Sequence, residues 1–324
     1  MFQTPILLIT FNRPDHMRRV FEEIKKQKPR YLYVFQDGPR ESNANDTEKC
    51  ALVRAIFNES LDWECELKTY FLEENLGCGK GPATAITWFF ENVEQGIIFE
   101  DDCLPHEDFF SYCAELLDIY KNNNKISFIG GSSFQNGNQR GDASFYFSAG
   151  PRGTCGWATW KRTWEKFDYM LESVDDKLLI RLIKKYFKKS GQILYWQEIY
   201  ETVKKDRYNE SCWDYQFYCS CWKYGMLAAI PNQNLITNIG YDEEGTHTLG
   251  AFHPAANITT MPIIPIKLPT KIVLDKKADF YVHKHYIAPY EYGWSGFKRL
   301  PFRLNKRIKR FLSHQGSWIR KNNK

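Results

Sequence analysis

An almost uninterrupted run of apolar residues, Pro5–Phe11, limits more than any other feature how this chain can fold. A strand that is apolar on both faces has to be covered on both, as the central strands of parallel sheets are. Pro14 then opens a segment whose apolar residues, from Met17 to Ile24, recur at helical spacing. A buried strand followed by an amphipathic helix is the repeating unit of α/β folds.

This alternation of strands and helices continues to about residue 130. Later strands are expected at Tyr31–Gln36, Glu66–Leu72, Gly96–Phe99 and Ile126–Ile129. Later helices are expected from Asp46 or Thr47 to Asn58, at Pro82–Val93 and at Glu107–Tyr120. The sequence therefore predicts an α/β fold with a mixed, mainly parallel sheet flanked by helices.

The second half of the chain is less regular. Gly130–Gly156 is rich in Gly, Ser and Asn, which predicts loops. Helices are expected at Asp175–Lys188, Gln192–Lys205 and Trp213–Lys223, and a strand at Leu227–Pro231. After Ile236, repeated prolines predict loops and short extended pieces.

The composition is that of a folded globular protein. Of the 324 residues, 43% are hydrophobic and 26% charged, and no apolar run approaches the roughly 20 residues that cross a bilayer. The first residues lack the basic region of a secretion signal. The nine cysteines are scattered and form no paired Cys-X-X-Cys motifs, so we expect reduced thiols and a cytosolic protein.

The most informative motif directly follows the strand expected at Gly96–Phe99. There, Glu100, Asp101 and Asp102 place three carboxylates at the end of a buried strand, which is electrostatically costly unless a cation neutralises them. Ligands bind at this edge of open parallel sheets, and carboxylate oxygens favour Mg²⁺ or Mn²⁺. A solvated acidic turn is the alternative interpretation.

Three loops are expected at the same edge of the sheet, because each follows a strand. They are Thr10–Arg13, Asp37–Arg40 and the glycine-rich Asn75–Gly81. Glycines let backbone amides approach a ligand closely, and Lys80 can compensate phosphate charge. None of these loops is a Walker loop or a dinucleotide-binding motif, so together with the acidic run they favour a nucleotide-diphosphate ligand.

Four segments carry a resemblance to a known family. Pro5–Pro14, Gln36–Arg40, Asn75–Gly81 and Phe99–Asp102 resemble, in this order, the nucleotide-sugar half of GT-A glycosyltransferases. The Glu-Asp-Asp form and the later Cys212-Trp213-Asp214 are more similar to the family of N-acetylglucosaminyltransferase I than to family 2, whose motif is usually Asp-X-Asp. The similarity covers about residues 4–250 and implies a Rossmann-like GT-A fold.

The resemblance implies roles for particular residues. The nucleotide sugar would be bound by Thr10, Asn12, Arg13, Asp37, Lys80, Glu100, Asp101 and Trp157. Among these, Asp37 would contact the uracil, and Glu100 and Asp101 the ribose and the donor sugar. Asp102 would be the direct ligand of Mn²⁺ or Mg²⁺, and His247, in a polar loop, would reach the diphosphate or the metal or simply cap a turn.

Catalysis by an inverting enzyme needs a carboxylate that accepts the proton of the acceptor hydroxyl. The resemblance assigns this role to Asp214, with Glu210 as the nearby alternative, although Asp214 could equally be a helix N-cap. Trp157 would stack on a sugar ring. Trp160 and Trp164 are one helical turn apart, so at least one of them is expected in the core.

The function expected is that of a metal-dependent, inverting glycosyltransferase that moves a hexose or N-acetylhexosamine from a UDP-sugar to a glycan or lipid-linked acceptor in surface polysaccharide biosynthesis. A sugar-nucleotide nucleotidyltransferase and a non-catalytic carbohydrate-binding protein are the alternatives. Residues 1–130 would bind the nucleotide sugar and 131–250 the acceptor. Residues 251–296 would form an irregular extension and 297–324 a basic amphipathic tail.

The positive charge of the chain is concentrated in that tail. The net charge of the chain is +5, and residues 297–324 hold ten Lys and Arg and no Asp or Glu. Apolar residues such as Phe302, Phe311 and Trp318 are interleaved with these charges, which is typical of a segment on an anionic membrane surface. We therefore expect a cytoplasmic protein, peripheral at the inner face of the plasma membrane. A solvated helix is the simpler alternative, and no other feature supports binding to nucleic acid.

Deletion of residues 297–324 is expected to release the protein from anionic vesicles, because this segment supplies both the basic and the apolar contacts. Co-sedimentation with phosphatidylserine vesicles measures this, while turnover on a soluble acceptor should be unchanged. Equal binding of the full and shortened chains to the vesicles would exclude the tail as the membrane contact.

Overall fold

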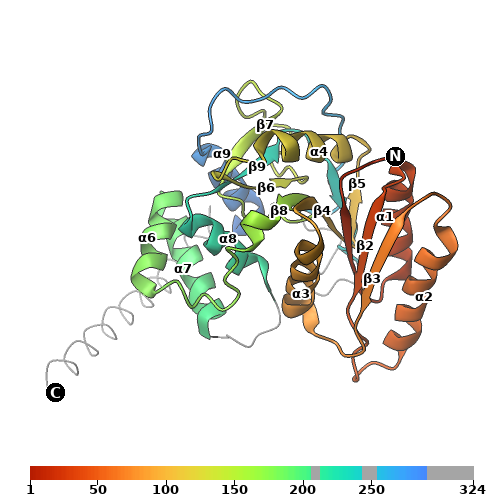
Figure 1. Ribbon diagram of the computed structural model, residues 1–324. Coiled ribbons are helices and arrows are strands. Elements are labelled where there is room, and N and C mark those ends of the chain that lie inside the picture. The colour runs from red at the N-terminus through yellow and green to blue at the C-terminus, as the bar shows by residue number, and fades with distance from the viewer. Residues whose placement is uncertain (206–211, 243–253, 290–324) are drawn as a thin grey trace, which may run out of the picture.

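The computed structural model describes residues 1–205, 212–242 and 254–289 (Figure 1). A sheet of eight strands runs through it in the order β3-β2-β1-β4-β8-β6-β9-β7. These strands are β1 (Ile6–Thr10), β2 (Tyr31–Gln36), β3 (Glu66–Phe71), β4 (Gln95–Glu100), β6 (Ile126–Gly130), β7 (Phe145–Ser148), β8 (Trp157–Trp160) and β9 (Leu227–Pro231). Only β8 and β7 run against the other six, so the fold is mixed, mainly parallel α/β, as predicted.

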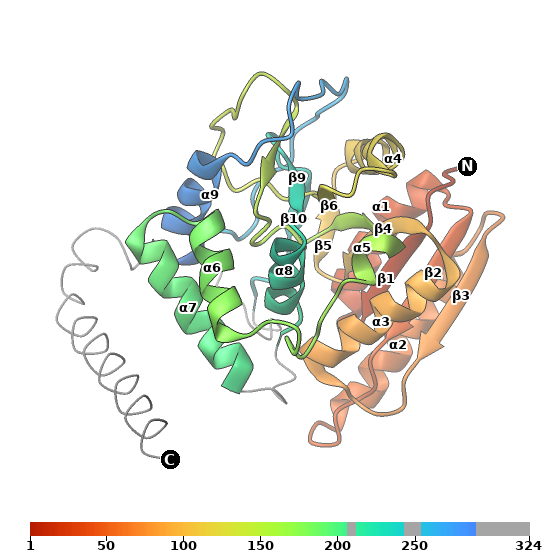
Figure 2. The ribbon, with the colours of Figure 1, turned by 60° about the vertical axis from the view of Figure 1, so that its left-hand side comes forward.

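Helices cover both faces of this sheet. One face packs against α1 (Pro14–Gln27), α2 (Asn45–Ser60) and α4 (Asp108–Tyr120). The other packs against α3 (Gly77–Asn92), α6 (Asp176–Tyr186), α7 (Ser190–Lys205) and α8 (Asp214–Lys223). Both ribbon views show α6 and α7 together at the end of the molecule away from α1 and α2, with α8 on their inner side (Figure 2).

The sequence of β1 explains this two-sided covering. Its side chains alternate between the faces, so Leu7 and Ile9 pack with the buried residues of α3, and Ile6 and Leu8 with those of α1. All five residues of the strand are buried. The expected strands and helices of the first half are confirmed, except at the start of α3.

The start of α3 differs from the expectation. Residues 77–81 of the loop predicted at Asn75–Gly81 form the first turn of this helix, which starts at Gly77 rather than Pro82. The reason is that the carboxylate of Asp37 accepts hydrogen bonds from the backbone N–H groups of Leu76 and Gly77, which the first turn of a helix otherwise leaves unsatisfied.

The second half contains more regular structure than expected. The loop region 130–156 includes β7, and the aromatic segment after it forms β8, at a central position of the sheet. Two short strands, β5 (Cys103–Pro105) and β10 (Ile236–Asn238), form an antiparallel pair. In the extension, Asp275 caps the helix α9 (Lys276–Val282), where loops and short extended pieces were expected.

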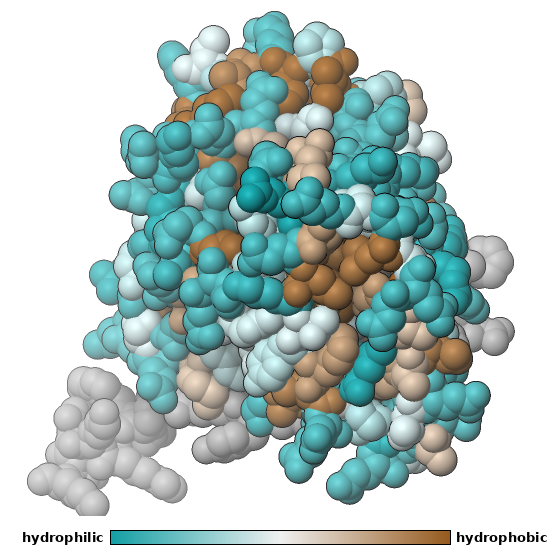
Figure 3. Space-filling view, turned by 45° about the vertical axis from the view of Figure 1, so that its right-hand side comes forward, coloured by the Kyte–Doolittle hydropathy of each residue, from teal (hydrophilic) through white to brown (hydrophobic). Residues whose placement is uncertain are grey.

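The face drawn in Figure 3 is mostly hydrophilic, with hydrophobic residues gathered near its centre and its upper edge. None of the helices formed by the described residues has the length and the apolar character needed to cross a bilayer. The basic tail, residues 297–324, lies outside the described residues, and its contact with a membrane stays a prediction.

Candidate functional site

A cavity of about 920 Å³ lies at the carboxyl ends of β1, β2 and β4. Its walls are completed by the start of α3, by the loop before β8 and by the start of α8. The strand order reverses here, because β2 and β4 lie on opposite sides of β1. Open α/β sheets bind ligands at such a point, and the volume falls in the range of about 300–1,000 Å³ that is usual for ligand sites.

Most of the residues predicted for the site meet in this cavity. Its lining includes Thr10, Asn12, Arg13, Asp37, Glu100, Asp101, Asp102 and Asp214. The structure thus places the acid predicted as catalytic base at the same cavity as the acidic run, more than 100 residues earlier in the chain. His247 and Glu210 lie outside the described residues.

The wall between β1 and α2 is held by a buried carboxylate, Asp46. It accepts a hydrogen bond from Asn12 Nδ2 at 2.7 Å, and it pairs with Arg40, whose Nε lies 2.6 Å from Asp46 Oδ2. This pairing, more than any other contact, lowers the pKa of Asp46. Thr10, buried, donates its hydroxyl to the backbone oxygen of Phe35 at 3.0 Å. Asn12 and Thr10 therefore shape the cavity wall, and Arg40 adds a cation to it.

Asp37 is held in place by the start of α3. Its oxygens accept hydrogen bonds from the backbone of Gly38, Leu76 and Gly77 at 2.8–3.0 Å and from Asn75 Nδ2 at 3.2 Å. The side chain predicted to contact a base is thus also the anchor of a helix. Its place in the lining leaves it next to any ligand in this part of the cavity.

At the end of β4, Arg13 lies among the carboxylates. It forms an ion pair with Asp101, and its Nη2 lies 3.3 Å from Asp102 Oδ2. Burial lowers the pKa of Arg13, but the charges of Asp101 and Asp102 outweigh it and raise the pKa above its usual value. Within the described part of the chain, the second oxygen of Asp101 is buried and receives no hydrogen bond.

The negative charge at this point exceeds what Arg13 can neutralise. Burial, followed by the charges of Asp102 and Asp101, raises the pKa of Glu100 from 4.5 to about 8, and Asp214 adds to this effect. A carboxyl group whose pKa is shifted so far marks a place where a cation or a hydrogen-bond donor is favoured.

The segment directly after β10 packs against Asp102. Ile239 donates its backbone N–H to the backbone oxygen of Asp102 at 2.9 Å. A Cβ on Gly240 would lie 2.4 Å from Asp102 Oδ2 and 2.9 Å from an Arg13 nitrogen, so only glycine fits here without moving both charged groups. Asp102 is therefore held by a segment that follows it by more than 130 residues in the chain.

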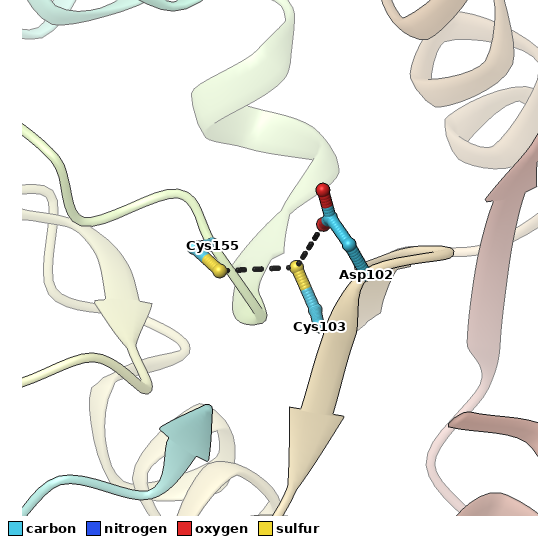
Figure 4. A group of neighbouring side chains, drawn as sticks. All are labelled: Asp102, Cys103 and Cys155. Carbon is cyan, nitrogen blue, oxygen red and sulfur yellow. Dashed lines mark hydrogen bonds between the residues drawn. The ribbon is translucent and has the colours of Figure 1, made fainter. Parts of the chain in front are cut away.

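Two thiols stand beside Asp102 (Figure 4). The Sγ atoms of Cys103 and Cys155 are 3.1 Å apart, and Cys103 Sγ lies 3.4 Å from Asp102 Oδ1. All three residues line the cavity, and none of the nine cysteines, all of which lie in the described residues, forms a disulfide. Sequence reasoning missed this cluster, although the position of Cys103 directly after the acidic run was a signal that could have found it.

Trp157 does not line the cavity, in contrast to the role expected for it. It is 1% exposed and stacks on Trp213, with ring centroids 5.7 Å apart and 26° between the planes. Trp213, the residue before α8, lies at the cavity instead, next to Asp214. Trp160 and Trp164 are both buried, which confirms the expectation that at least one belongs to the core.

Lys80 also lies elsewhere. It lines a separate groove of about 780 Å³ between α3 and residues 167–170, together with Trp88 and Tyr169. The reason is that residues 77–81 are helical, so Lys80 is on a different face of α3 from Gly77, Cys78 and Gly81, which line the cavity. Arg13, Arg40 and Lys49 are the basic residues of the cavity lining.

No model of a known protein family matches the chain, and no curated protein matches it significantly. Solved structures that match in part include S. aureus TarS 1–349, with 12% identity over 73% of this chain and 59% of that chain and a TM-score of 0.38. Another is HddC from Yersinia pseudotuberculosis, with 8% identity over 50% of this chain and 78% of that chain and a TM-score of 0.30. A cytidylyltransferase from Leptospira borgpetersenii has 12% identity over 64% of this chain and 95% of that chain and a TM-score of 0.31. This chain thus spans about three fifths of the TarS structure. TM-scores this low do not indicate a function, whereas the residues of the cavity do.

Proposed function

We propose that the protein is a metal-dependent glycosyltransferase that transfers a sugar from a UDP-sugar, with inversion, to a glycan or lipid-linked acceptor. One observation carries this proposal. A single cavity at the switch point of the sheet is lined by three consecutive carboxylates that share Arg13 and, at the start of α8, by a further carboxylate, Asp214.

The residues at the end of β4 suit a divalent cation. Three carboxylates, Glu100 to Asp102, face one Arg13, the pKa of Glu100 is raised to about 8, and a buried oxygen of Asp101 lacks a donor among the described residues. Each of these features indicates missing positive charge. We assign Asp102 as the residue that holds Mn²⁺ or Mg²⁺, because it reaches the cavity and Asp101 is engaged by Arg13. When bound, the ion supplies charge stabilisation to the departing diphosphate.

The chain's own groups perform the remaining tasks. Arg13, Arg40 and Lys49 carry positive charge at the cavity, where they can pair with phosphate oxygens. Trp213, rather than Trp157, offers the aromatic surface for a sugar ring. The closely packed segment around Gly240 holds Arg13 and Asp102 in position.

Asp214 is proposed as the general base. It accepts the proton of the acceptor hydroxyl while that oxygen bonds to the anomeric carbon, and the bond from this carbon to the diphosphate oxygen breaks on the opposite face. Its place at the start of α8, in the lining of the same cavity as the end of β4, supports this role. We place the enzyme in the cytoplasm, at the membrane surface where a lipid-linked acceptor is available.

Incubation of the protein with UDP-, GDP- and CMP-sugars tests the proposal. Nucleotide release is expected from a UDP-sugar, in the presence of Mn²⁺ and not of a chelator, because the departing diphosphate needs the cation. Chromatographic detection of free nucleotide measures it. Release that does not depend on metal, or no release from any donor, contradicts the proposal.

A further inference from the structure

We propose that Asp102, Cys103 and Cys155 form a binding site for a thiophilic divalent ion of the Zn²⁺ class. Their ligand atoms all lie within 4.8 Å of one another, with one carboxylate oxygen and two sulfurs as donors. The site would exist whether or not the protein transfers sugars, and it uses sulfur, which Mg²⁺ avoids and Zn²⁺ prefers.

The spacing of the donors is close to what such an ion needs. The two sulfurs are 3.1 Å apart. Because Zn–S bonds are about 2.3 Å, tetrahedral binding requires the sulfurs to be about 3.8 Å apart, so they have to separate by less than about 1 Å. Cys155 lies in the loop before β8, where such a shift does not disturb a strand, while Cys103 is fixed in β5.

The surroundings of the sulfurs also suit a bound ion. Asn238 directs its side-chain amide toward Cys155 Sγ at 3.5 Å, a contact of the kind that orients metal ligands. Two thiolates and Asp102 carry three negative charges, of which a divalent ion neutralises two. Arg13, whose Nη2 lies 3.3 Å from Asp102 Oδ2, is shared between Asp102 and Asp101. On binding, each thiol releases its proton to solvent as its sulfur bonds the metal.

The cluster opens toward the cavity. Asp102, Cys103 and Cys155 all belong to the cavity lining. Three protein ligands therefore leave a fourth position for water or for a ligand in the cavity, as in zinc sites that act on substrates. A thiophilic ion bound here occupies Asp102, so it would compete with the Mn²⁺ or Mg²⁺ of the proposed transfer.

Titration of the full, reduced protein with Cd²⁺ tests this site, since thiolate ligation gives an ultraviolet charge-transfer band. The wild type should develop this band up to one equivalent of Cd²⁺. Cys103→Ser and Cys155→Ser should each lose about half of the band or more and bind Cd²⁺ at least about 10-fold more weakly. Cys65→Ser is the matched control, because Cys65 is a half-buried thiol outside the cavity lining, and it should behave as the wild type does.

A measurement on the unaltered chain guards against variants that fail to fold. Zn²⁺ should protect Cys155 from alkylation by iodoacetamide, while the alkylation of Cys65 stays the same. Peptide mass spectrometry identifies which cysteines are alkylated. No charge-transfer band, a band that both cavity variants retain, or a Cys103–Cys155 disulfide that resists reductant overturns the proposal. Binding of UDP with Mn²⁺ is assayed separately, so failure of the thiol site and failure of the proposed transfer are distinguishable.

Discussion

Asp102→Asn is expected to lower metal-dependent UDP release by about 10³-fold or more, which corresponds to roughly 4 kcal/mol of lost transition-state stabilisation. The substitution keeps the shape of the side chain and removes the charge that we assign to the cation. It also removes one of the charges that raise the pKa of Glu100, so that this pKa should fall. Free UDP, measured at several Mn²⁺ concentrations, gives the rate.

Asp118→Asn is a suitable control for this experiment. Asp118 is also an aspartate paired with a basic residue, Lys121 at 2.8 Å, but it lies exposed on α4, away from the cavity. Its variant should release UDP at the wild-type rate. Near-normal activity of Asp102→Asn at ordinary Mn²⁺ concentrations would show that the cation, if any, is held elsewhere.

Asp214→Asn is expected to reduce transfer by about 10²–10⁴-fold, the usual contribution of a general base. Binding of UDP with Mn²⁺, followed by calorimetry, should stay close to that of the wild type, because the amide keeps the size of the side chain and does not alter β4. The loss should thus appear in kcat rather than in the KM for the donor.

The N-cap role considered for Asp214 from the sequence is wrong, because Trp213 is the N-cap of α8 and Asp214 is the first residue of the helix. The remaining structural interpretation is that an acid in the first turn of a helix interacts favourably with its dipole, by about 0.3–1 kcal/mol. Asp176→Asn separates the two, because Asp176 likewise is the first residue of a helix, α6, and is exposed. Both variants should lower the Tm slightly. If Asp214→Asn and Asp176→Asn both changed the rate of transfer only slightly, Asp214 would have a structural role in the helix and no catalytic one.

The fold and most of the site could be predicted because their signals are local. The apolar run of β1 and the periodicity of α1 are short patterns that burial on two faces dictates. The carboxyl ends of parallel strands meet at one edge of a sheet. The sequence alone therefore predicts that Arg13, Asp37 and Asp102, which each follow a strand, lie close together, and all three line the cavity.

What could not be predicted depends on contacts between distant segments. Trp157 is covered because α8 places Trp213 over it, and the register of β8 between β4 and β6 decides which way it faces. Lys80 turns away from the cavity because Asp37 anchors the start of α3 at Gly77, five residues before the expected start at Pro82. The approach of Cys155 to Cys103 spans 52 residues, so the position of Cys103 after the acidic run did not indicate its partner.

The small β5–β10 ladder has a consequence for the modularity of this protein. It ties the segment immediately after Asp102 to residues 236–238, and Ile239 then bonds to the aspartate itself. A fragment that stops before Ile236 would contain every carboxylate assigned here. It would lack β10, the strand that pairs with the segment directly after Glu100, Asp101 and Asp102. The two halves of the sequence are therefore not independent building blocks, and grafting the first alone into another scaffold would transfer the residues without their geometry.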